Sequence, residues 1–116
     1  MRSTWLVIGF LAVIVVSPVS TGWANPAHDR LAAMSELKRS ELLAVFVESS
    51  GHACHTVSRT FYQGDDSKGN AFWNVECSDR EAYVVQIKND VPGSTTVLSC
   101  RRLRAVGGSA CFKKLE

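Results

Sequence analysis

Three residues that lie close together in the chain, His52, Cys54 and His55, have side chains of the types that bind metals. Zinc sites use imidazole and thiolate ligands, but they space them as two pairs, such as C-x2-C with a second pair elsewhere. The sequence has no such second pair, and it lacks the first cysteine of a C-x-x-C-H haem attachment motif. An oxidised Cys54 would also lack the thiolate that a metal needs. We therefore expect two surface histidines here, and no metal or other cofactor.

A second set imitates a calcium-binding loop, with Asp65, Ser67 and Glu76 at the spacing of its positions 1, 3 and 12. Such a loop needs a glycine at position 6, where the chain turns sharply, and Asn70 occupies that position. The residues 72–76 also alternate in polarity as a strand does. The sequence therefore predicts a solvated hairpin loop instead of a calcium site.

Nucleophilic catalysis needs an activated serine or cysteine beside a base and a group that orients the base. The chain has serines and three histidines, but neither a G-x-S-x-G elbow nor a C-x-x-C redox pair. No catalytic residue is predicted. The alternative is a small periplasmic hydrolase or ligand-binding enzyme that uses His52 or His55. It requires a pocket in which a histidine and a carboxylate lie about 3 Å apart.

Two groups of side chains suit contact with another molecule. The C-terminal region is basic, through Arg101, Arg102, Arg104, Lys113 and Lys114. Such a cluster suits an acidic partner or an anionic membrane surface, although a solvated rim has the same composition. Among the aromatic residues, Tyr62 and Phe72 are expected on the face opposite Trp73. They are the better candidates for an exposed apolar patch.

Four short runs must position these side chains, over residues 56–63, 70–77, 82–88 and 95–100. They are rich in β-branched and aromatic residues and are separated by turn signals, which predicts antiparallel strands joined by hairpins. In the second run Trp73, Val75 and Cys77 alternate with polar residues, which gives one dry and one wet face. The expected register places Cys77 opposite Tyr83, Val75 opposite Val85 and Trp73 opposite Ile87.

A helix is expected before the strands, because apolar residues recur there at intervals of three and four. They are Leu31, Met34, Leu37, Leu42, Leu43, Val45 and Phe46. Ser35 or Ser40 can cap an internal start, so one helix or two short ones remain open. The helix should end near Ser50, with Gly51 after it, and residues 25–34 form a flexible start that contains His28.

The predicted fold is α+β. An N-terminal helix packs on one face of a four-stranded antiparallel meander sheet, and a disulfide-tied segment follows at the C-terminus. The single domain covers residues 35–116.

The chain has four cysteines, and an even number in a small exported chain implies disulfides. Cys77 and Cys100 should lie on either side of the third strand, about 10 Å apart, which is too far for a disulfide. Cys54 precedes the first strand, which can pair with the second near Cys77. We therefore predict the bridges Cys54–Cys77 and Cys100–Cys111.

Residues 1–24 have the pattern of a secretory signal peptide. Arg2 supplies a positive charge, residues 5–16 form an uncharged run, and Gly22-Trp23-Ala24 provides small residues before a cleavage site. The run is shorter than the roughly 18–20 residues that span a bilayer. We expect a periplasmic or secreted protein, with an uncleaved membrane anchor as the alternative.

The composition fits a small globular domain, since 46% of the 116 residues are hydrophobic and 21% are charged. The formal net charge is +2. This value is too small to predict nucleic-acid binding. Removing residues 1–24 leaves a chain whose core alone is marginal, so the disulfides should contribute to stability.

The stretch G-D-D-S-K-G-N-A-F-W-N-V-E-C-S-D, with A-Y-V-V-Q-I, L-S-C and A-C-F-K-K-L after it, resembles a group of uncharacterised small secreted bacterial proteins. This resemblance covers residues 54–115 and implies no known activity. The order of helix and hairpins also resembles PepSY-like domains, which implies a helix on an antiparallel sheet and an inhibitory or partner-binding role. The chain differs from that pattern in its four cysteines and in Arg80, at a turn where a glycine is expected.

These observations favour an exported, non-enzymatic module that binds a protein or an envelope component. The expected contact residues are Tyr62, Phe72, Arg101, Arg102 and Arg104.

Overall fold

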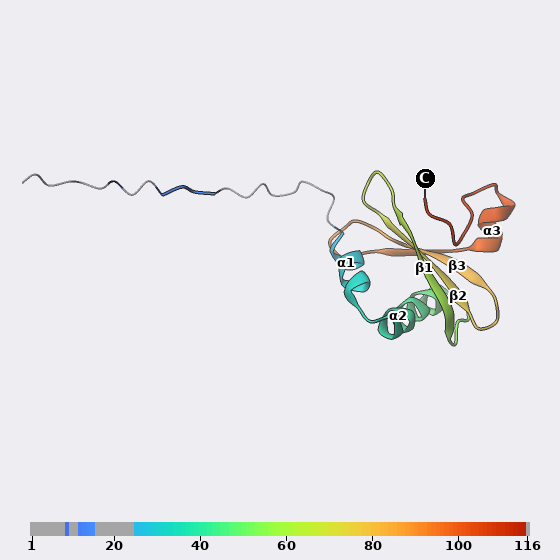
Figure 1. The fold of residues 1–116 in the computed structure, drawn as a ribbon. Helices are drawn as coiled ribbons and strands as arrows, with labels where there is room; N and C mark the ends of the chain where they lie inside the picture. Colours follow the sequence, from blue (N-terminus) through green and yellow to red (C-terminus); the bar gives the residue numbers. More distant parts are fainter. Residues whose placement is uncertain (1–8, 10–11, 16–24, 116) are drawn as a thin grey trace, which may run out of the picture.

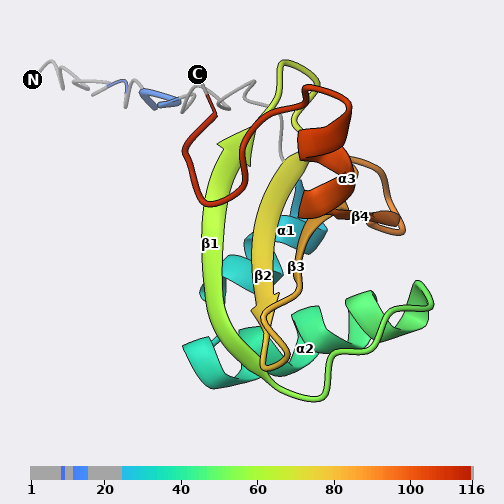
Figure 2. The same cartoon turned by 90° about the vertical axis from the view of Figure 1, so that its right-hand side faces the viewer.

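The computed structural model describes residues 9, 12–15 and 25–115 (Figure 1). The expected leader, residues 1–24, lies almost entirely outside the described residues. The elements are α1 (Pro26–Ala33), α2 (Glu36–Ser49), β1 (Val57–Asp65), β2 (Ala71–Cys77), β3 (Ala82–Ile87), β4 (Thr95–Ser99) and α3 (Cys100–Ala105). In Figure 2 the helices α1 and α2 lie behind the sheet, and α3 lies in front of it together with the C-terminal segment.

The four strands form one antiparallel sheet in the order β1-β2-β3-β4. The predicted α+β fold with a meander sheet is therefore confirmed. The predicted register between β2 and β3 was wrong by two residues, because Val75 lies opposite Tyr83 and Trp73 lies opposite Val85. The turn is tighter than expected, since the Cys77 N–H donates to the Glu81 carbonyl across a three-residue loop. A shift of two residues keeps every side chain on its predicted face.

Two helices precede the sheet, which settles the alternative between one helix and two. Ser35 ends the connection between them, and its side chain accepts a hydrogen bond from the Lys38 N–H at the start of α2. Leu43 and Val47 bury their side chains fully against the sheet. Leu37 and Val45 are 71% and 53% exposed, so the expected apolar stripe was wrong at these two positions. Gly51 has a φ of 90° directly after the helix, as predicted.

The expected flexible start over residues 25–34 is instead mostly the helix α1. Asn25 caps this helix, because its Oδ1 accepts a hydrogen bond from the His28 N–H at 3.1 Å. Its Nδ2 donates to the carbonyls of Gly69 and Ile87 at 3.1 and 3.0 Å. Leu31 is 1% exposed in the core. The buried side chain of Leu31 and the three hydrogen bonds of Asn25 therefore hold this segment on the domain.

The core lies between the two N-terminal helices and the first face of the sheet. Its fully buried members from the strands include Ala71, Val75, Val85 and Ile87. Both predicted disulfides are present, Cys54–Cys77 with a Cα separation of 5.3 Å and Cys100–Cys111 with 6.0 Å.

The C-terminal segment, residues 108–115, lies on the second face of the sheet (Figure 2). Gln63 holds it, because its buried Nε2 donates to the carbonyls of Ala110 and Lys113 at 3.0 and 3.1 Å. Asn74 is also fully buried, and its Oδ1 accepts a hydrogen bond from the Phe112 N–H. The segment therefore covers part of a face that would otherwise be open to solvent.

Candidate functional site

The second face of the sheet carries an apolar groove of about 460 Å³. Its apolar walls are Phe72, Val84, Leu98, Leu103 and Leu115. Asp65, Asp66 and Ser67 line one end of the same groove. These residues come from all four strands, from the β1–β2 loop, from α3 and from the C-terminal segment, so the path of that segment creates the groove.

Strand alternation places these side chains together. Phe72 alternates with the buried Trp73, and Val84 and Leu98 lie directly opposite each other on β3 and β4. Leu98 is 45% exposed. Among the described strands, β4 pairs only with β3, so its outer edge carries unpaired backbone groups beside the groove.

Phe72 therefore lies on the predicted face, but the prediction for Tyr62 was wrong. Tyr62 lies opposite Trp73 on the first face, with the two ring centroids 5.0 Å apart. A register shift between Val57 and Arg59 explains the difference. One extra residue in a strand turns all later side chains to the other face, and this bulge could not be read from the alternation of residue types.

The basic residues of the C-terminal region have different surroundings. Arg101 forms an ion pair with Glu81, with 2.6 Å between Nη2 and Oε1. Arg102 and Arg104 are exposed on α3. The Lys114 ammonium donates to the Tyr62 carbonyl at 2.8 Å and lies 5.4 Å from the Phe61 ring centroid. Of the predicted basic cluster, Arg101 and Lys114 thus make contacts within the domain, whereas Arg102 and Arg104 present exposed charge on α3.

A polar aromatic cluster that the sequence analysis missed joins α1 to the sheet. The Trp73 Nε1–H donates to His28 Nδ1 at 3.1 Å, and the His28 ring stacks on Tyr62 with centroids 4.7 Å apart. Burial lowers the pKa of His28, while nearby Asp29 and Asp65 act in the opposite direction. Burial also raises the pKa of Tyr62. Because His28 was expected to lie in a flexible start, the sequence did not predict this contact.

The histidines after α2 do not form a metal centre. Cys54 is in a disulfide, and the His52 ring packs against Tyr83 with centroids 4.8 Å apart. Within the part of the chain that the structure describes, no group of three His, Cys, Asp or Glu side chains is arranged to hold a metal ion.

The calcium-loop residues are also separated. Asp65 lies opposite Ala71 at one end of the hairpin, whereas Glu76 lies opposite Arg59 further along. The loop satisfies its own polar groups, because Asp66 accepts hydrogen bonds from the N–H groups of Lys68 and Asn70 at 2.9 and 3.0 Å. The side chains of this region are therefore arranged as in a solvated hairpin loop.

The hydrolase alternative requires a histidine beside a carboxylate. His55 lines a shallow groove of about 320 Å³ that Glu41 also lines. Over residues 25–115, no hydrogen bond or ion pair joins either His52 or His55 to a carboxylate. The geometry thus gives this alternative no positive support.

The fold and its two disulfides define a small α+β domain suited to an oxidising, extracytoplasmic compartment. None of the helices in the described ranges is long and apolar enough to cross a membrane. Comparison of the chain with protein-family models, with curated proteins and with solved structures finds no match.

Proposed function

We propose that the chain is an exported, non-enzymatic module, periplasmic or secreted after removal of residues 1–24, that binds another protein. The partner adds an extended segment to the outer edge of β4 and places an apolar side chain in the groove. The open edge of β4, with Leu98 exposed beside the groove, is the observation that carries this proposal.

Strand addition suits this edge for two reasons. Main-chain hydrogen bonds to an open strand edge give affinity, and pockets for alternate side chains of the added strand give specificity. A strand beside β4 directs every second side chain to the second face, next to Leu98. The partner strand therefore meets an apolar groove at the point where it needs a pocket.

The resemblance to PepSY-like domains agrees with a partner-binding role, and it is part of the proposal. The two disulfides support an extracytoplasmic partner, since such bridges persist in oxidising compartments. The arginines of α3 lie next to Leu103 in the chain and favour a partner with acidic residues beside its apolar anchor.

Site-specific photo-crosslinking in cells that export the protein tests this proposal. A photoreactive phenylalanine derivative at Leu98 should give a discrete higher-mass adduct. The matched control is Val45, which is similarly exposed but lies on α2 in the opposite layer. The same probe at Val45 should give no such adduct.

A second experiment tests the groove itself. With the probe at Thr96, a neighbour of Leu98 on the same face of β4, an adduct should form. The substitution Leu103→Asp in the groove wall should remove it. Equal adducts from Leu98 and Val45, or a Thr96 adduct that survives Leu103→Asp, would contradict binding at this surface.

A further inference from the structure

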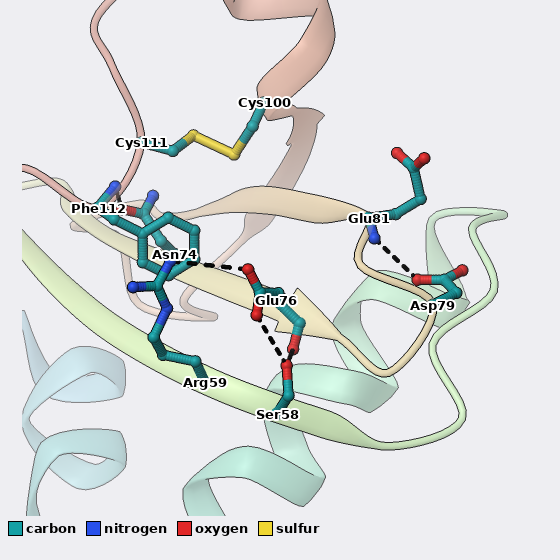
Figure 3. Close-up of polar contacts among 9 residues, drawn as sticks. All are labelled: Ser58, Arg59, Asn74, Glu76, Asp79, Glu81, Cys100, Cys111 and Phe112. Carbon is teal, nitrogen blue, oxygen red and sulfur yellow. Dashed lines mark hydrogen bonds and ion pairs between the residues drawn. A yellow bond between two sulfur atoms is a disulfide. The ribbon is translucent and has the colours of Figure 1, made fainter.

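A second cavity, of about 370 Å³, lies between the β2–β3 turn, α3 and the C-terminal segment. We call it the arginine pocket. The charged side chains that line it are Arg59, Glu76, Arg80 and Arg104. The Cys100–Cys111 disulfide and Phe112 form an apolar part of its wall, and Figure 3 shows these two beside Arg59 and Glu76. The pocket is separate from the apolar groove, with which it shares only Ser109.

The charge in this pocket is unbalanced, because three guanidinium groups and one carboxylate give a net formal charge of two positive. Glu76 forms an ion pair with one of the three guanidinium groups, that of Arg59, with 3.6 Å between Glu76 Oε2 and Arg59 Nη2. The other Glu76 oxygen, Oε1, accepts a hydrogen bond from Ser58 at 3.1 Å (Figure 3). Neither Arg80 nor Arg104 forms an ion pair with any residue that the structure describes.

Arg59 is held in place before any ligand arrives. Its guanidinium carbon lies 3.7 Å from the centroid of the Phe112 ring, and the Phe112 N–H donates to buried Asn74 (Figure 3). The Cys100–Cys111 disulfide fixes α3, and with it Arg104, to the same segment. A preorganised arginine loses less conformational freedom when it binds an anion.

The backbone of the pocket is strained at two positions. Arg80 has a φ of 71° and Phe112 a φ of 59°, and these are the two non-glycine residues with positive φ in the described ranges. Arg80 occupies the left-handed position of a three-residue hairpin loop, where glycine is the usual residue. Strained residues of this kind cluster at ligand-binding and active sites.

We propose that the arginine pocket binds the phosphate group of a phosphomonoester or of free phosphate. Such a group carries about 1.5 to 2 negative charges at pH 7, which is close to the net charge of the pocket. Arginine forks bind phosphate oxygens through paired N–H donors, and a carboxylate would leave one positive charge uncompensated. The phosphate comes either from solution or from a lipid headgroup, and the experiment distinguishes these sources.

The first arm titrates the purified exported protein with inorganic phosphate at constant ionic strength, observed through its backbone amide NMR signals. We expect saturable shifts for residues of the arginine pocket. Arg80→Asn removes the charge but keeps a residue that tolerates positive φ. Arg80→Asn and Arg104→Gln should each weaken binding by roughly tenfold, because each removes a charge-assisted hydrogen-bond donor.

Arg102→Gln is the matched control, since Arg102 is an exposed arginine of the same helix and does not line the pocket. It should leave phosphate binding unchanged. Arg80→Lys keeps the positive charge but loses the paired N–H donors of the guanidinium group. This variant should bind phosphate with intermediate affinity. The amide spectrum of each variant verifies that it is folded.

The second arm measures binding to phosphatidylcholine vesicles that contain either phosphatidic acid, a monoester, or phosphatidylglycerol, a diester. Saturable phosphate binding that Arg80→Asn weakens supports the proposal with a free source. Preference for phosphatidic acid that Arg80→Asn removes supports it with a lipid source. Loss of binding in Arg102→Gln equal to that in Arg80→Asn would overturn it. So would the absence of saturable phosphate binding together with no preference between the two lipids.

Discussion

Trp73 is a residue of the sheet that contacts both N-terminal helices. From α1, His28 accepts its indole N–H, and from α2 the Arg39 guanidinium carbon lies 5.2 Å from its ring centroid. Arg39 also donates to the Leu31, Ala32 and Met34 carbonyls at the end of α1. One arginine thus satisfies carbonyls that a short helix leaves without partners, and it fixes the angle between the helices.

The hydrogen bond at His28 makes stability depend on pH. His28 Nδ1 must be unprotonated to accept the Trp73 N–H, and burial lowers its pKa in the folded state. The unfolded chain, with an ordinary histidine pKa of about 6.5, then binds more protons than the folded chain as the pH falls below that value. The melting temperature should therefore be lower at pH 5 than at pH 7.5.

His28→Asn tests this prediction, because the Asn side chain keeps an acceptor near the position of Nδ1 and does not titrate. Its melting temperature should change less between the two pH values than that of the natural chain. The control is His52→Asn, at a histidine packed on Tyr83, which should retain the full pH dependence. An undiminished pH dependence in His28→Asn would assign the effect to other groups.

At the scale of elements, the C-terminal segment differs from the strands because buried side-chain amides supply most of its hydrogen bonds to the sheet, with one backbone bond from the Leu115 N–H to the Gln63 carbonyl. Gln63 at the end of β1 makes two of these bonds. Asn74 contributes another, and its Nδ2 has no partner among the described residues. Removing Gln63 leaves two half-buried carbonyls without a donor, which together cost about as much as one fully buried unpaired group, roughly 1–3 kcal/mol.

Gln63→Met keeps the length of the side chain and removes both donors. We expect it to lower the free energy of unfolding by about 1–3 kcal/mol, as measured by urea denaturation. Gln86→Met is the control, since Gln86 is a half-buried glutamine of β3 with no side-chain hydrogen bond to a described residue. It should change the free energy by less than about 1 kcal/mol. Equal losses in the two variants would show that the segment does not depend on Gln63.

Alternation of residue types predicted which side chains of β2 and β3 lie on each face. A register error of two residues does not change that assignment, because side chains alternate with a period of two. It could not predict the face of Tyr62, which depends on a bulge, or the tight turn, which depends on a left-handed arginine. Phe72 was identifiable as a site residue from its position beside Trp73. The groove and the arginine pocket were not, because the path of the C-terminal segment creates them and no local pattern encodes that path.

At the scale of the whole molecule, one disulfide ties the sheet to the segment before it, and the other ties two segments on the second face to each other. Cys54 and Cys77 are each 1% exposed and join the end of β2 to the segment before β1. The second bridge joins the start of α3 to the C-terminal segment on the other face. Each layer beside the sheet therefore has one covalent tie.

Replacing Cys54 and Cys77 together by Ser should lower the free energy of unfolding by about 2–5 kcal/mol in urea denaturation. Replacing Cys100 and Cys111 together should cost less. The first bridge spans 23 residues and the second 11, and the longer loop restricts the unfolded chain more. The first pair also leaves two polar hydroxyls in the core. A larger loss from the second pair would contradict this order.

The cap that Asn25 places on α1 has a consequence for the proposed removal of residues 1–24. Cleavage after Ala24, as proposed, leaves Asn25 as the first residue, with its side chain on His28, Gly69 and Ile87. Removal of one more residue would leave Pro26 as the terminus, and the carbonyls of Gly69 and Ile87 would lose their donor. Under the proposed cleavage, an aminopeptidase would have to remove Asn25, a residue that the folded domain buries.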